Sequence, residues 1–222
     1  METKQAEGRV ARRQKRNRTA LLEAGEEVMS EKGIDAATMQ EIAERADVGA
    51  GTVYTYFKSK DDLAVAVLEN VMERLAERIE DVTDTFTDPA QVYAFGIRQV
   101  LETATGDVRW KQLLHRSEVI ADALYRRMGP YPMRDLRLAT EAGRFKVSDP
   151  ALIWRLTSHA IVGLALGITK DGLPPTSLDE AVIRLLCMTG LAIDDAIELA
   201  ARPCPPLPPQ PAPRKNRMHD HS

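Results

Sequence analysis

The chain has 222 residues and a mass of 24.7 kDa, which suits one large domain or two small ones at about 100–200 residues per domain. Hydrophobic residues make up 44% and charged residues 28%, a balance typical of soluble proteins that excludes a chain disordered throughout. The longest uncharged run in the apolar C-terminal half covers the 14 residues 156–169, fewer than the ~18 that a membrane-spanning helix needs. The basic first 20 residues lack the apolar run of a secretory signal, and two cysteines provide no disulfide framework, so a cytoplasmic location is expected.

The net charge of −3 is unevenly distributed along the chain. Residues 1–18 carry seven basic and two acidic side chains, residues 61–201 carry 15 basic and 22 acidic ones, and residues 202–222 carry four basic and one acidic. An acidic body with a basic N-terminal arm favours an anionic partner at that end, and a solvated leader is the alternative.

Apolar residues recur at helical spacing through most of the sequence, and strand patterns are almost absent, so we expect an all-α fold. The first helix is predicted over residues 17–32, and Gly33 acts as its stop signal. Thr38 and Glu41 form a predicted capping box for the next helix. In such a box the threonine hydroxyl accepts a hydrogen bond from the Glu41 amide, and the Glu41 carboxylate accepts one from the Thr38 amide.

Two short helices follow, over residues 39–46 and 50–57, with a turn at residues 47–49 between them. This is the spacing of a helix-turn-helix, whose second helix enters the major groove of DNA. Val53 and Phe57 are predicted to face the core. The outward positions of the second helix bear hydroxyl and phenol groups that suit phosphate oxygens and base edges, and they are Thr52, Tyr54, Thr55 and Tyr56.

Longer helices are predicted after the helix-turn-helix, and most begin at recognisable capping residues. Ser59, Asp88 and Asp149 are the expected caps of three of them, and residues 177–180 read as a second capping box. The segment Gly129-Pro130-Tyr131-Pro132 is expected to interrupt one helix. The predicted ranges are about 60–82, 89–105, 107–128, 133–142, 150–169 and 178–201. The Pro-rich residues 202–222 are expected to form an extended or disordered tail.

The stretch from Thr38 to Leu63 resembles the DNA-binding domain of the tetracycline-repressor (TetR) family. Its Tyr54-Thr55-Tyr56-Phe57 run and the following Lys60 match that family's signature, and the match covers about residues 14–74. The resemblance implies a basic arm at 1–13, a DNA-binding domain at 14–74 and a regulatory and dimerisation domain at 75–201.

The resemblance also implies roles for individual residues. Thr38 would cap its helix and contact a phosphate, and Lys60 would contact another. Thr52 and Thr55 would lie nearest the bases, whereas Tyr54 and Tyr56 would meet the DNA backbone. Arg16 and Arg18 belong to a basic stretch, residues 9–18, that would contact the backbone or the minor groove.

The chain departs from the family pattern at Gly49, Ala50 and Gly51, where other members often carry a longer polar side chain. No Arg, Asn or Gln lies between Gly49 and Phe57, so we expect specificity to depend on thymine methyl groups, water and DNA shape. A dinucleotide-binding loop at these glycines is rejected, because Tyr54 takes the place of the third glycine.

In the resembled family the mid-chain helices surround an effector cavity. Candidate effector-binding residues are the aromatic and histidine side chains Tyr93, Trp110, His115, Tyr125, Trp154 and His159. Simple core packing is the alternative for each of them. Because the body is acidic, we expect a neutral, largely apolar or weakly cationic effector.

Small residues recur on the last two predicted helices and would let helices approach closely. A monomeric core explains part of this pattern, and a four-helix homodimer interface explains it better. The interface candidates are Ala160, Gly163, Gly167, Cys187 and Gly190.

The sequence contains no phosphate loop, nucleophile elbow or zinc-protease motif, so we expect no cofactor, no bound metal and no enzymatic activity. His219 and His221 provide too few ligands for a metal site. The expected function is a ligand-responsive transcriptional repressor that binds a palindromic DNA operator. An effector-independent activator or architectural DNA-binder is the alternative.

Overall fold

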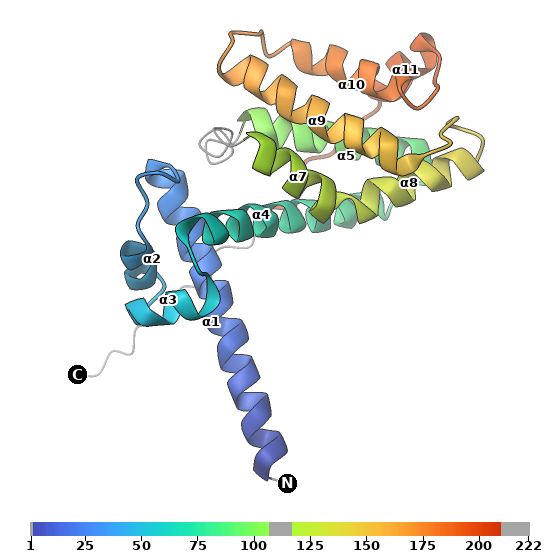
Figure 1. Ribbon diagram of the computed structural model, residues 1–222. Helices are drawn as coiled ribbons and strands as arrows, with labels where there is room; N and C mark the ends of the chain where they lie inside the picture. Colours follow the sequence, from blue (N-terminus) through green and yellow to red (C-terminus); the bar gives the residue numbers. More distant parts are fainter. Residues whose placement is uncertain (1, 107–116, 210–222) are drawn as a thin grey trace.

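The computed structural model describes residues 2–106 and 117–209, and every regular element in those residues is a helix (Figure 1). The predicted all-α class is therefore confirmed. The helices are α1 (Glu2–Lys32), α2 (Met39–Arg45), α3 (Ala50–Tyr56), α4 (Lys60–Thr83), α5 (Pro89–Gly106), α7 (Ser117–Met128), α8 (Pro130–Glu141), α9 (Pro150–Thr169), α10 (Ser177–Cys187) and α11 (Ile193–Ala200).

The N-terminal head consists of α1, α2, α3 and the beginning of α4 (Figure 1). Helix α1 begins at Glu2, so the prediction of a helix starting at residue 17 after a separate arm was wrong. The added turns are rich in Arg, Lys, Gln and Ala, which have high helix propensity and extend a helix already nucleated by the docked residues 17–32. Their N-terminal part projects away from the rest of the molecule in Figure 1.

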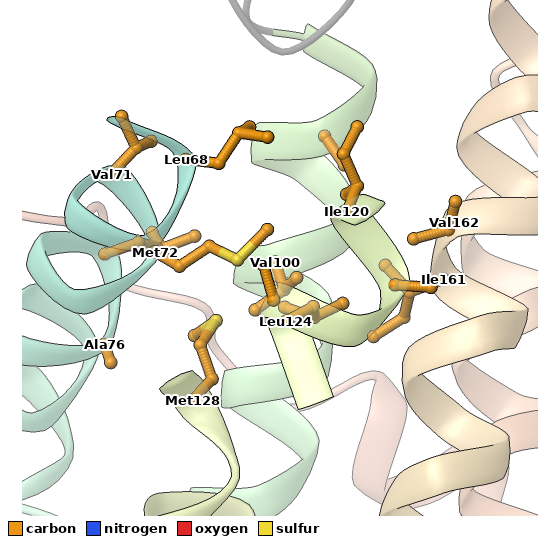
Figure 2. Close-up of a cluster of buried hydrophobic side chains, with 14 of the residues drawn as sticks. Leu68, Val71, Met72, Ala76, Val100, Ile120, Leu124, Met128, Ile161 and Val162 are labelled. Carbon is orange, nitrogen blue, oxygen red and sulfur yellow. The ribbon is translucent and has the colours of Figure 1, made fainter. Parts of the chain in front are cut away.

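The body packs α4 against α5 and α7, and α9 packs on α5, α7 and α8, with α10 and α11 on the side of α5. Its centre is apolar. Figure 2 shows side chains from α4, α5, α7 and α9 meeting there, including Met72, Val100, Leu124 and Ile161. Because this core uses the middle of α4, from Leu68 to Ala76, and the head uses its beginning, one continuous helix belongs to both regions.

The expected interruption at residues 129–132 is shorter than predicted. Helix α8 begins at Pro130, so only Gly129 separates it from α7. Proline is tolerated there because the first residues of a helix need no amide donor. The glycine is required by close packing: a Cβ at Gly129 would lie 2.3 Å from the Tyr125 carbonyl oxygen and 3.3 Å from Trp154 Nε1.

The last predicted helix is divided in two. Helix α10 ends at Cys187 and α11 begins at Ile193, with Gly190 between them at a φ of +86°, a left-handed value that favours glycine. The Lys146 amide donates to the Thr189 carbonyl oxygen at 2.8 Å, which fixes this turn against the α8–α9 connection. The capping box predicted at Ser177 was also wrong, because Thr176 precedes the helix without a side-chain cap.

Helix α9 is the one described helix long and apolar enough, by length and composition, to cross a membrane. It includes Arg155, and one of its faces is buried against α5, α7 and α8. The core helix of a helical bundle has the same composition, and that is the environment of α9 in this fold.

Candidate nucleic-acid interface

Helices α2 and α3 form the predicted helix-turn-helix. The Thr38 hydroxyl accepts a hydrogen bond from the Glu41 amide at 3.2 Å, which confirms one half of the predicted capping box. The other half differs, because the Glu41 carboxylate accepts a hydrogen bond from Lys32 Nζ at 2.6 Å and so joins α2 to α1. Ile42 and Val53 are fully buried between the two helices.

The turn itself is stabilised by backbone hydrogen bonds. The Val48 amide donates to the Ala43 carbonyl at 3.0 Å and the Asp47 amide donates to the Glu44 carbonyl at 3.2 Å, which is the Schellman arrangement. Asp47 takes the left-handed position with a φ of 53°, and a short polar side chain tolerates that conformation better than most. The turn therefore fixes the angle at which α3 leaves α2.

The outer surface of α3 begins at its N-terminus. Gly49, Ala50 and Gly51 are exposed, and a Cβ on Gly51 would meet no other atom within 4 Å. This end of α3 thus presents backbone and a single methyl group, with no side chain long enough for two hydrogen bonds to one base.

Four hydroxyl-bearing residues follow on α3, and they differ in exposure. Tyr54 is 59% exposed and Thr55 is exposed, whereas Thr52 and Tyr56 are half-buried. Thr55 Oγ1 donates a hydrogen bond to the Gly51 carbonyl oxygen at 3.3 Å, within the same helix. Tyr56 packs against the core and presents less surface than the sequence pattern predicted.

Helix α4 begins beside α3. The Ser59 hydroxyl accepts a hydrogen bond from the Asp62 amide at 3.1 Å, which confirms Ser59 as the N-cap of α4. Lys60 Nζ donates to the Asp35 carbonyl oxygen at 2.6 Å and thereby joins α4 to the α1–α2 connection. An ammonium group has three donors, so this contact leaves Lys60 able to bind a phosphate as well.

The basic residues of α1 extend this charged surface. Arg16 and Arg18 are exposed, and the Arg18 guanidinium lies 5.6 Å from the centre of the Phe57 ring, directly after α3. On the neighbouring α1–α2 surface the cations are already paired: Arg45 contacts Glu31 at 3.0 Å and Glu27 at 3.2 Å. The cations beside α3 are therefore the ones best placed to meet an anion.

A small cavity lies inside the body, near the C-terminal end of α4 and far from the head. Its volume is about 30 Å³, room for about two water molecules. Its walls come from α4, α5, α7, α8 and α9 and are mostly apolar. The lining residues are Ala76, Ile79, Glu80, Tyr93, Gly96, Ile97, Val100, Met128, Tyr131, Pro132, Asp135 and Trp154.

Two predicted effector residues line this cavity. The buried Tyr93 hydroxyl lies 3.3 Å from Thr157 Oγ1, and burial raises its pKa well above the ordinary tyrosine value. Trp154 Nε1 donates to the Tyr125 carbonyl oxygen at 3.0 Å, which fixes the orientation of the indole ring.

Two other predicted effector residues, Tyr125 and His159, lie outside the cavity. The Tyr125 ring lies 3.5 Å from the Arg155 guanidinium, and His159 is exposed with Nδ1 2.8 Å from the Arg155 carbonyl oxygen. Trp110 and His115 lie outside the described residues.

The sequence analysis missed an acidic group in the cavity wall. Burial raises the pKa of Asp135 to about 6, against the opposing effect of two hydrogen bonds from Arg134, Nε at 2.9 Å and Nη2 at 2.7 Å. Arg134 also binds Glu80 of α4. A signal was present in the sequence, because Pro132, Asp135 and Leu136 share one helical face and a carboxylate on an apolar face is unusual.

The exposed side of α9 carries an apolar strip beside the exposed Arg155 and His159. Leu152 is 53% exposed and Leu156 is 48% exposed, and Ala160 and Gly163 continue the same face. A Cβ on Gly163 would meet nothing within 4 Å, so the protomer leaves open space there.

Three other interface candidates lie in different surroundings. A Cβ on Gly167 would lie 2.5 Å from Leu173 Cδ1, and one on Gly190 would lie 2.8 Å from Lys146 Cβ. Both glycines therefore serve packing within their own chain. Cys187 is half-buried.

Comparison with known proteins identifies the family to which these features belong. Residues 21–67 match the bacterial regulatory proteins of the tetR family, and residues 88–202 match the tetracyclin repressor-like C-terminal domain. The chain belongs to the TetR family. Its members are DNA-binding transcriptional regulators and not enzymes, which confirms the resemblance seen in the helix-turn-helix.

Named relatives of this TetR-family regulator include both activators and repressors. The transcriptional activator FasR of Mycolicibacterium smegmatis is 29% identical over 154 residues, which cover 68% of this chain and 66% of FasR. The repressor KstR of the same species is 32% identical over 116 residues, 52% of this chain and 56% of KstR. The chain thus spans less than two thirds of the length of these relatives.

Solved structures of TetR-family proteins support the same fold. RolR in complex with the ligand resorcinol superposes with a TM-score of 0.80 at 27% identity, covering 89% of this chain and all of RolR. FadR from Bacillus subtilis in complex with stearoyl-CoA superposes with a TM-score of 0.58 at 22% identity, which shows the shared fold alone.

Proposed function

We propose that this TetR-family regulator is a ligand-responsive repressor that an effector releases from a palindromic operator. The observation that carries the proposal is the extent of α4. This helix begins at Lys60 beside the recognition helix α3, and Ile79 and Glu80 near its other end line the cavity. At 1.5 Å per residue the two ends of this path are about 30 Å apart. A ligand that moves the cavity wall can therefore move the head through one rigid element.

On DNA, the exposed and polar residues of the head take different roles in this proposal. Thr52 and Thr55 face the bases, and the bare N-terminus of α3 meets the duplex beside them. Tyr54, Tyr56, Thr38 and Lys60 contact phosphates, as do Arg16 and Arg18 of α1. The absence of a long polar side chain at residues 49–51 supports readout by methyl contacts and DNA shape.

Two copies of the chain must hold two heads at a fixed separation for this mechanism. We assign the contact between them to the exposed face of α9, where Leu152, Leu156, Ala160 and Gly163 present apolar surface. Half-sites one helical turn apart need recognition helices about 34–36 Å apart, so a shift of α4 that changes this separation weakens binding.

For the effector, we propose a small hydroxylated aromatic compound. The walls of the cavity are apolar, and Asp135 supplies an acceptor for a hydroxyl donor. The present volume of about 30 Å³ holds only about two water molecules, so an aromatic ring must displace the cavity wall in order to bind, and α4 is part of that wall. RolR, which covers nearly the whole chain at 27% identity, was solved with resorcinol. A neutral phenol also agrees with the polarity expected from the acidic body.

An effector-independent activator is the second candidate, because FasR is named as an activator. One experiment in two stages distinguishes the repressor from the activator. First, DNA retained by the purified protein from a random pool should show inverted half-sites. Second, resorcinol should weaken binding to that DNA, and a reporter carrying the site should rise in expression when resorcinol is added. Retention of no DNA sequence would refute the proposal, and a reporter that falls when the protein is deleted would favour the activator.

A further inference from the structure

Helix α1 carries a buried acidic residue where it packs against α4 (Figure 1). Glu26 is 8% exposed and lies on the apolar face of α1, between the buried Leu22 one turn before it and the buried Met29 one turn after it. A carboxylate is rarely buried unless a partner is present. The partner is Arg74 of α4, whose Nη2 donates a hydrogen bond to Glu26 Oε2.

This ion pair contributes little net stability. Arg74 Nε is also buried, and no group in residues 2–106 or 117–209 accepts a hydrogen bond from it. The cost of a buried donor without an acceptor, together with the desolvation of two charges, offsets much of the attraction between the two side chains. The pair is therefore better explained by the arrangement of helices that it fixes.

A second contact joins α1 to α4 two turns away from the ion pair. A Cβ on Gly25 would lie 2.9 Å from Val67 Cγ2, so the two helices approach closely there. Val67 and Arg74 are seven residues apart on α4, about 10 Å along its axis. The ion pair thus restrains the rotation of α1 about the close contact at Gly25.

The recognition helix follows the direction of α1. Ion pairs join α2 to α1, Lys32 with Glu41 at 2.6 Å and Arg45 with Glu31 at 3.0 Å. Helix α3 leaves α2 at an angle that the turn between them fixes. A rotation of α1 on α4 is therefore also a rotation of α3.

We propose that Glu26 and Arg74 are positioning residues, whose ion pair sets the direction in which the recognition helix projects from α4. This inference rests on the proposed function, in which two heads bind half-sites at a fixed separation. Arg74 is two residues before Ala76, which lines the cavity, so a displacement of α4 at the cavity reaches the pair directly. The pair acts on the spacing of half-sites and not on base readout, because α3 presents the same side chains in either direction.

The test varies the spacer between two half-sites selected from a random pool. Each added base pair moves the second half-site by about 3.4 Å and rotates it by about 35° around the duplex, so affinity against spacer length reports the geometry of the two heads. In the full chain, Glu26→Gln removes the charge of one partner and Arg74→Gln that of the other. We expect each variant to flatten the profile, so that the preferred spacing loses about fivefold or more of its advantage over spacings one base pair longer or shorter. The affinity for an isolated half-site and the base preference within it should stay unchanged.

Three further variants separate positioning from a general loss of stability. The double variant Glu26→Gln/Arg74→Gln should flatten the profile no further than either single variant, because the two residues act as a unit. Glu31→Gln removes an ion pair within the head, and Leu186→Ala destabilises the body at a fully buried site in α10. Both should keep the profile of the unmodified chain, and thermal melting measures the stability of every variant.

A folded Glu26→Gln variant with the spacing profile of the unmodified chain would overturn the proposal. Equal losses of affinity for the isolated half-site and the paired sites would also overturn it, because the ion pair would then hold the head together without directing it. The unmodified chain tests the function itself: if it binds no duplex, or binds with no preferred spacing, the proposed operator binding fails and this inference fails with it.

Discussion

Arg134 of α8 donates two hydrogen bonds to Glu80 of α4, from Nη1 to Oε2 at 2.6 Å and from Nη2 to Oε1 at 2.9 Å. The same guanidinium binds Asp135, so one arginine joins the wall of the cavity to the helix that begins at the DNA-binding head. A planar guanidinium holds two carboxylates in fixed directions, which makes this group sensitive to small displacements of α4.

This relationship predicts that Glu80→Gln weakens the coupling between the cavity and the DNA site. The coupling is measured as the ratio of resorcinol dissociation constants with and without operator, and reciprocity requires the same ratio for operator binding. We expect the ratio to fall towards one in Glu80→Gln while the protein still binds operator. Glu180→Gln removes an ion pair of the same kind with Arg184 on α10 and should leave the ratio unchanged. A ratio unaltered by Glu80→Gln would show that α4 is coupled to the cavity by other contacts.

The raised pKa of Asp135 predicts a pH dependence of stability. In the folded chain this pKa is about 6, against an ordinary value of 3.8, because burial disfavours the charged carboxylate. The folded state therefore holds the proton more tightly than the unfolded state, and the free energy of unfolding due to this group falls as the pH rises from about 4 to 6.

Asp135→Asn removes this titration and separates it from that of other carboxylates. We expect the melting temperature of the variant, relative to that of the unmodified protein, to increase between pH 4 and pH 7. Thermal melts at one-unit intervals measure the difference directly. A difference that stays constant over this range would mean that Asp135 is ionised in the folded protein at pH 4 as readily as in the unfolded chain.

Local sequence signals predicted the helix-turn-helix and three of the caps. Thr38, Ser59 and Asp149 each accept an amide hydrogen bond within the next three residues, so a short sequence window contains the whole interaction. The local Gly-Pro pattern predicted a break at residues 129–132, and the structure shortens that break to Gly129. The division at Gly190 depends on a contact with Lys146, far away in the chain, and no local pattern contains it.

The candidate sites divide in the same way. The exposed surface of α3 follows from helical spacing, although Tyr56 is more buried than expected because it packs against the core. The cavity depends on how five helices meet, so spacing could nominate Tyr93 and Trp154 but could not exclude Tyr125, whose ring lies against Arg155 outside the cavity.

Lys60→Ala should weaken binding to every DNA sequence and reduce the salt slope by about one unit, because the residue is proposed to contact a phosphate. Its hydrogen bond to the Asp35 carbonyl is exposed, so we expect a loss of stability of at most about 1 kcal/mol. Fluorescence anisotropy with labelled duplex at several salt concentrations measures the slope, and Lys170→Ala on the body is the control. A change in base preference with the slope intact would assign Lys60 to base readout.

Thr52→Ala and Thr55→Ala should relax base preference at particular operator positions and leave the salt slope unchanged. Thr55 is exposed, so its loss should affect recognition with little effect on folding, whereas the half-buried Thr52 should also affect packing slightly. Selection of DNA from a random pool with each variant gives the preference, and we expect each lost contact to reduce discrimination by about 1 kcal/mol or more. An unchanged preference in both variants would move base readout to the N-terminus of α3.

Gly163→Leu should disrupt the dimer and leave the folded protomer intact. In the single chain a Cβ at Gly163 meets open space, so a leucine can be accommodated on the exposed face of α9. Across a close helix contact the same side chain overpacks the interface, at a cost of about 1–3 kcal/mol. Sedimentation at micromolar concentration should show a larger monomer fraction, and thermal melting at high dilution should show an unchanged profile.

Gly190→Ala is the contrasting variant. The left-handed φ of Gly190 and the 2.8 Å distance from an added Cβ to Lys146 Cβ mean that this substitution should destabilise the protomer. If the unmodified protein sediments as a monomer, this face of α9 is not a dimer interface. If Gly163→Leu forms dimers as strongly as the unmodified protein, the two protomers meet on another surface.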